Sequence, residues 1–175
     1  QINGVGGGNP LTSKVAIVSK SKRPNIDVDY LFLQVAVDKY VVSSRQNCGN
    51  ILAGIAPFAL ERGLVKPEKT KTTIRIFMEN SKQVAVSTVE TPNSNLTYEG
   101  DTYIDGVTFP GAPISLEFLD IEGSLCGQLL PSGNAKDEVD GYSLTMIDNG
   151  MPCVIIEADQ LGLKGNETGD ELEKN

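Results

Sequence analysis

The chain has 175 residues, enough for one domain or for one domain and part of a second. Its hydrophobic content of 39% and charged content of 22% are typical of an ordinary globular protein. The net charge of −8 argues against a nucleic-acid-binding surface, because no basic cluster offsets the acidic excess. The three cysteines have no regular spacing, so they do not predict a disulfide framework, and without histidine they do not predict a Cys/His zinc site. The sequence shows no recognisable signal or membrane segment. These features favour a reducing, cytoplasmic location.

A glycine-rich loop at residues 4–10 precedes two predicted strands. Residues 15–18 form a short apolar run that is typical of a buried strand, and residues 30–37 alternate well enough for another. The loop does not fit a nucleotide site, because Asn9 stands where a dinucleotide fingerprint needs its third glycine and no Gly-Lys-Ser/Thr follows. Backbone amides that approach a carboxylate fit the loop better, and a plain tight turn is the alternative.

The next feature is an uncharged run at residues 51–60, which predicts a helix buried on all sides. A run of this length is too short to span a bilayer, so protein must surround it, most simply a sheet curled around the helix. Asn47 or Ser44 is expected to cap its beginning, and Gly63 is expected to end it. Pro57 predicts a bend or a break into two pieces.

The beginning of this predicted helix is a candidate anion site. A helix N-terminus presents unpaired N–H groups and the positive end of the helix dipole, which favours a carboxylate. Cys48 stands there between Asn47 and the pair Gly49 and Asn50. The pattern therefore predicts a small anion held against a thiol, although a small buried hydrophobic residue remains the alternative for Cys48.

From residue 72 onward, β patterns dominate. Predicted strands fall at residues 73–78, 83–89, 114–119, 142–147 and 154–157, the first two as a hairpin. Residues 131–138 are typical of a linker. Many strands around one buried helix predict an α+β fold with a domain boundary near residue 135.

Four segments together resemble the PrpF family, which belongs to the diaminopimelate-epimerase-like superfamily. They are residues 6–16, 47–54, 129–134 and 147–152, and they occur in family order. The resemblance implies two similar halves, each a mixed or antiparallel sheet around a central helix, with the active site in the cleft between them. It also implies that 1–135 is most of the first half without its first strands, and that 136–175 starts a second half that is mostly missing.

The resemblance further implies an activity. Family members include 2-methylaconitate isomerases of propionate breakdown and 4-oxalomesaconate tautomerases of gallate breakdown. A member is thus expected to be an isomerase of a small unsaturated tricarboxylic acid, using proton abstraction and an allylic proton shift without a cofactor or a metal. The lysine that matches Lys14 is the leading candidate base, and Cys48 lies at the same cleft. The alternatives for Lys14 are a charged clamp, a proton donor or an ordinary surface lysine.

Further residues are expected to hold the carboxylates of the substrate. They are Gly7, Gly8, Asn9, Ser13, Asn47, Gly49, Asn50, Asn149 and Met151. The last two lie in a turn that needs no function if it only joins two strands.

Two other functions stay open. A second, facing cysteine would make a two-cysteine amino-acid epimerase, and a protein without catalysis could bind tricarboxylates or support an aconitase-type dehydratase, whose genes often accompany the family. A homo-oligomer is compatible with the sequence, whereas nucleic acid and membrane are not expected partners. The isolated segment is expected to show little or no turnover, because half of the cleft would be missing.

Overall fold

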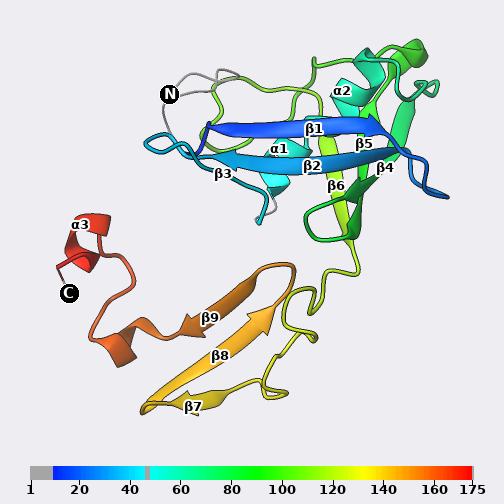
Figure 1. Ribbon diagram of the computed structural model, residues 1–175. Coiled ribbons are helices and arrows are strands. Elements are labelled where there is room, and N and C mark those ends of the chain that lie inside the picture. Colours follow the sequence, from blue (N-terminus) through cyan, green and yellow to red (C-terminus); the bar gives the residue numbers. More distant parts are fainter. Residues whose placement is uncertain (1–9, 46–47, 175) are drawn as a thin grey trace. The chain divides into compact units, whose positions relative to one another are not determined.

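The computed structural model describes residues 10–45 and 48–174 and forms two compact units, one up to Leu119 and one from Asp120 onward. Strands and a few short helices make up both units, which confirms the predicted α+β class (Figure 1). The domain boundary expected near residue 135 stays a prediction.

The first unit is built on a six-stranded mixed sheet. Its strands are β1 (Lys14–Lys20), β2 (Val28–Val35), β3 (Val42–Ser43), β4 (Lys71–Met78), β5 (Gln83–Glu90) and β6 (Ile114–Leu119). The order is β1-β2-β4-β5-β6, with β3 paired to β2. The pair β2–β4 is parallel and the other pairs are antiparallel, including the predicted hairpin β4–β5.

Alternation along the strands explains which face of the sheet is covered. On β4, Ile74, Ile76 and Met78 are fully buried, whereas the residues between them are partly exposed. The same alternation buries Tyr30 and Phe32 on β2. Because successive side chains of a strand point to opposite faces, these residues form one apolar face, and the helices pack on that face.

The predicted single helix is two short helices, α1 (Gly49–Leu52) and α2 (Ile55–Glu61). The break falls at Gly54, which precedes α2, and not at Pro57. Pro57 lies in the first turn of α2, where backbone N–H groups have no partner within the helix, so the proline costs little there. Gly63 follows the end of α2 with φ 65°, which confirms its predicted role as the terminating glycine.

The caps and the burial of the helices also differ from expectation. Cys48 is the N-cap residue of α1, so Ser44 is not, and Asn47 lies outside the described residues. Burial is incomplete, because Phe58 in α2 is 39% exposed and Gly49 at the start of α1 is exposed. The run is therefore apolar without being covered on every side.

The sheet curls toward α1 from both of its edges. Lys14 on the edge strand β1 contacts Cys48 at the start of α1. At the other edge strand, β6, the ring of Phe118 comes so close that a Cβ at Gly49 would lie 3.5 Å from its Cζ atom. In Figure 1, α1 is seen behind the strands β1 and β2. This arrangement supports the expected sheet curled around a helical segment.

The core of the first unit joins the helices to the central strands. Leu52 is the one buried residue of α1, and α2 adds Ile55, Ala56, Ala59 and Leu60. These side chains pack with the buried residues of β2, β4 and β5 in one cluster. A short 3₁₀ turn, η1 (Pro92–Ser94), follows β5.

The second unit holds a three-stranded antiparallel sheet in the order β7-β8-β9. Its elements are β7 (Asp137–Val139), β8 (Tyr142–Asp148), β9 (Pro152–Ile156), the 3₁₀ turn η2 (Ala158–Leu161) and α3 (Gly169–Leu172). Asp148 is fully buried, and its Oδ2 accepts hydrogen bonds of 2.7 Å from the backbone N–H groups of Leu125 and Cys126. These bonds fasten the loop that precedes the sheet.

Within residues 10–45 and 48–174, no helix combines the length and the apolar character needed to cross a bilayer.

Candidate active site

Lys14 and Cys48 meet although 34 residues separate them in the sequence. Lys14 Nζ donates a hydrogen bond of 3.4 Å to Cys48 Sγ, and both side chains are half-buried. The predicted amine and the predicted thiol are therefore in direct contact. A proton can pass between two groups at this distance, which makes the pair the candidate centre for acid–base chemistry.

Neighbouring backbone contacts hold Lys14 in place at the first position of β1. Its Cα pairs with that of Gln34 on β2. The side-chain amide of Gln34 donates to the carbonyl oxygens of Pro10 at 2.9 Å and Ser13 at 3.0 Å, and the Val35 N–H also donates to Ser13. These bonds attach the segment before β1 to β2, so the backbone that carries the Lys14 side chain is held in place.

Cys48 is held through its carbonyl oxygen, which accepts two hydrogen bonds. The Leu52 N–H donates at 3.3 Å as the first bond of α1, and the Tyr30 hydroxyl donates at 3.4 Å from β2. Tyr30 is fully buried, and this burial raises the pKa of its phenol well above the usual range, with the charge of Cys48 acting in the same direction. Tyr30 therefore remains a hydrogen-bond donor.

The other predicted site residues are distributed unevenly. Gly7, Gly8, Asn9 and Asn47 lie outside the described residues. Gly49 and Asn50 are exposed at the beginning of α1, directly after Cys48, whereas the Ser13 carbonyl is occupied by backbone and side-chain bonds to β2. Asn149 and Met151 belong to the second unit, where Asn149 forms an isolated bridge with Glu122 and Met151 is 69% exposed. Their assignment to the site stays a prediction.

The helix dipole contributes less than the sequence suggested. The prediction required a ten-residue helix, but α1 has four residues and its first two are exposed. One turn aligns few peptide dipoles, and solvent screens them. The polar group next to the Cys48 thiol is instead the Lys14 amine.

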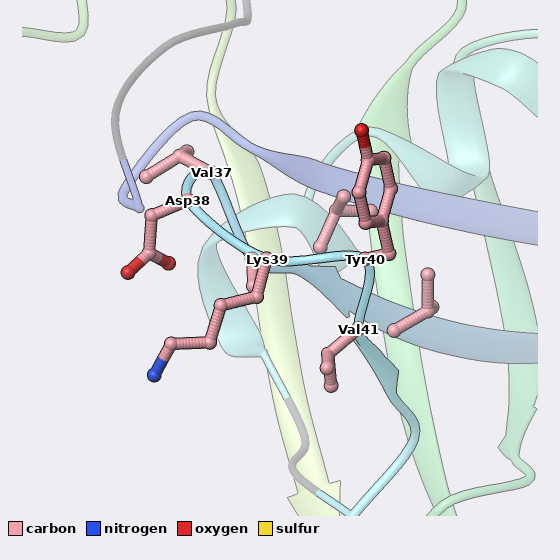
Figure 2. A pocket seen from close by; sticks show the side chains of 8 residues that line it. Val37, Asp38, Lys39, Tyr40 and Val41 are labelled. Atoms are coloured by element: carbon pink, nitrogen blue, oxygen red, sulfur yellow. The ribbon is translucent and has the colours of Figure 1, made fainter.

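A hollow elsewhere in the first unit is lined by residues 35–42 of the loop between β2 and β3 (Figure 2). The Lys39 and Tyr40 side chains extend to different sides of this loop. The lining includes neither Lys14 nor Cys48 and brings together no pair of acid and base beyond Asp38 and Lys39. The hollow is therefore not the candidate site.

Cys126 and Cys153 are free and exposed in the second unit. In the described part of the chain, no group of three or more His, Cys, Asp or Glu side chains is arranged to hold a metal ion.

The sequence analysis did not predict a role near the site for three residues. Tyr30 and Phe118 were read only as strand residues, and Asn80 only as a turn residue. The Asn80 side chain accepts from the Phe32 N–H at 2.8 Å and donates to the Phe32 and Ser44 carbonyl groups, which joins β2 to the segment leading to Cys48. No periodic pattern reveals such contacts, because they join positions far apart in the chain.

Comparison with known proteins extends these observations. The crystal structure of a methylitaconate-delta-isomerase is similar to this fold, with a TM-score of 0.82 and 36% identity over 99% of this chain and 46% of that chain. The chain is 61% identical to the (4E)-oxalomesaconate Delta-isomerase of Novosphingobium sp. strain KA1, covering 100% of this chain and 49% of the relative. It is 53% identical to the 4-oxalomesaconate tautomerase of Pseudomonas putida, and the match covers 99% of this chain and 48% of that relative.

A more distant relative is the 2-methyl-aconitate isomerase of Cupriavidus necator, which is 38% identical over 98% of this chain and 46% of its own length. The fold and the relatives thus define a class of isomerase-like proteins. The model of the PrpF protein family matches residues 1–175, and the chain belongs to this family. It spans about half the length of the curated relatives that it matches.

Proposed function

We propose that this chain supplies one side of the active site of an isomerase that shifts a double bond in a small unsaturated tricarboxylic acid. The first candidate substrate is 4-oxalomesaconate, and 2-methylaconitate is the second. This ranking is supported by the relatives, because the two named for oxalomesaconate are 61% and 53% identical, whereas the one named for 2-methyl-aconitate is 38% identical.

The observation that carries the proposal is the 3.4 Å contact between Lys14 Nζ and Cys48 Sγ. An allylic shift removes a proton from a carbon next to an unsaturated, carbonyl-like system and returns one at the far end of that system. Lys14 takes the proton in its neutral form, the electron pair moves across the double bond, and the same pair of groups supplies the returning proton. The substrate gains and loses one proton in total, so the reaction requires no oxidant, reductant or cofactor.

The carboxylates of the substrate need donors while charge spreads over the allylic system. Gly49 and Asn50 are suited to this role, because they are exposed and directly follow Cys48. We assign the same role to Gly7, Gly8, Asn9, Ser13 and Asn47, and to Asn149 and Met151 from the opposite half. The whole protein would then have the diaminopimelate-epimerase-like arrangement of two halves around a cleft and act in the cytoplasm.

The test uses the complete protein to which this chain belongs. Incubation with 4-oxalomesaconate or 2-methylaconitate in deuterated water is expected to give the isomer with deuterium at the exchanged carbon. Lys14→Ala is expected to lower kcat by about 10²- to 10⁴-fold, the usual contribution of a positioned acid–base group. Cys48→Ser is expected to retain part of the activity.

Lys20→Ala is the matched control, since Lys20 lies on the same strand but donates to the Leu64 carbonyl at its far end. Full activity of Lys14→Ala would refute the assignment of Lys14 as the proton-transfer residue. A larger loss of activity in Cys48→Ser than in Lys14→Ala would refute it as well. Binding of the tricarboxylate without deuterium exchange would favour a binding partner of an aconitase-type dehydratase. Exchange at the α-carbon of an amino acid would favour an epimerase.

A further inference from the structure

Tyr30 is a buried polar residue directly behind the candidate site. It lies in the middle of β2, opposite Val18 on β1 and beside Met78 on β4, and none of its surface is exposed. Its hydroxyl lies 3.4 Å from the carbonyl oxygen of Cys48. A buried hydroxyl needs a hydrogen-bond partner, and this carbonyl provides one.

The contact controls the part of the backbone from which the Cys48 side chain starts. Cys48 is the N-cap of α1, with extended φ and ψ angles of −139° and 105°. Its carbonyl oxygen is shared by the Tyr30 hydroxyl and the Leu52 N–H. Because α1 has four residues, it cannot fix its own first turn, and it depends on contacts from outside the helix.

We infer that Tyr30 is a positioning residue, which holds the Cys48 backbone so that Sγ stays within reach of Lys14 Nζ. This inference rests on the proposed function for its catalytic consequence, but the geometry stands without it. Tyr30 does not contact the substrate in this scheme, because it is fully buried. Burial also raises the pKa of Tyr30, which keeps its hydroxyl protonated as a hydrogen-bond donor.

The test removes the hydroxyl and keeps the ring, with Tyr30→Phe in the complete protein. The first measurement is the rate at which iodoacetamide alkylates Cys48, followed on the Cys48-containing peptide by mass spectrometry from pH 6 to pH 10. We expect at least a threefold change in rate and a shifted pH profile. Cys126 and Cys153 are internal standards, because both are exposed in the second unit and their rates should not change.

The second measurement is steady-state kinetics, where we expect kcat to fall about tenfold with little change in KM. Tyr98→Phe is the control, since it removes another hydroxyl hydrogen bond from the same unit, to Glu61 at 2.7 Å. A 4-aminophenylalanine at position 30 retains a donor and is expected to restore the wild-type alkylation profile. Loss of that rescue would overturn the inference.

The outcomes separate this inference from the proposed function. If wild-type protein turns over no tricarboxylate but Cys48 alkylation still responds to Tyr30→Phe, the proposed function fails and the positioning role stands. If turnover is present and both alkylation and kcat are unchanged in Tyr30→Phe, the positioning role is wrong. If Tyr30→Phe does not fold, the hydroxyl serves the stability of the sheet, and the positioning role is also wrong.

Discussion

Leu52 attaches α1 to the core, and its replacement by alanine tests how the site is held. Leu52 is fully buried and is the only buried residue of that helix. Leu52→Ala removes three carbon atoms, which at about 0.8 kcal/mol each lowers the free energy of unfolding by ~2.4 kcal/mol. A residual cavity adds to this loss, so we expect a total of about 3 to 4 kcal/mol.

A second effect should accompany the loss of stability. A helix as short as α1 is not stable alone, so without Leu52 its first turn loosens and Cys48 separates from Lys14. Iodoacetamide should then alkylate Cys48 faster than in the parent chain. Asn50→Ala is the control, because Asn50 lies in the same helix but is exposed, and its replacement should change stability by less than about 0.5 kcal/mol.

Urea unfolding followed by far-UV circular dichroism measures the free energy, and hydrogen exchange of β4 peptides assigns the loss to the first unit. A loss below about 1 kcal/mol for Leu52→Ala would contradict the proposed anchoring, because the buried Leu52 side chain would then contribute little to the free energy of unfolding. Equal losses for Leu52→Ala and Asn50→Ala would contradict it as well.

Two further predictions concern a loop and a tyrosine. Gly123→Ala should destabilise the second unit far more than Gly133→Ala. Both glycines have positive φ, but only at Gly123 would an added Cβ lie 2.3 Å from backbone atoms of Gln128. Thermal unfolding of the two variants measures the difference, and equal melting temperatures would refute the steric argument. Burial and the hydrogen bond to Glu61 raise the pKa of Tyr98 to about 12, above its ordinary value, so its contribution to stability should be complete below pH 10 and disappear as pH rises through 12. Urea titrations between pH 8 and pH 12 should show a smaller alkaline loss in Tyr98→Phe, and identical curves would contradict this linkage.

The strands could be predicted because their signal is local. On β4 the apolar side chains alternate with polar ones, and the structure buries Ile74, Ile76 and Met78 as that pattern requires. The short strand β7 escaped prediction, because Asp137 to Val139 carries no such pattern and forms a strand only by pairing with β8. The helix α3 was also missed within an apparently polar tail. A local signal was present there, because Thr168 and Glu171 form a capping box.

The helical run shows how composition can mislead. Ten uncharged residues predicted a continuous helix, with Pro57 as the point of weakness. The structure breaks the run at Gly54 instead, where an interior glycine is the costly residue of a helix, by about 0.5 to 1 kcal/mol relative to alanine. The break moves Pro57 into the first turn of α2, where the proline removes no helical hydrogen bond. The break at Gly54 therefore places Pro57 at a position where a helix tolerates proline.

The contact between Lys14 and Cys48 was expected from the family resemblance, and no periodicity of the chain predicts it. Its support, however, differs from the expected helix dipole. Because α1 is only one turn long, the position of Cys48 depends on Leu52 in the core and on Tyr30 in β2. Lys14 is itself fixed by the pairing of β1 with β2. Both members of the candidate pair therefore depend on the same central strand, so a displacement of β2 would change the distance between Nζ and Sγ more than any change in the helix dipole.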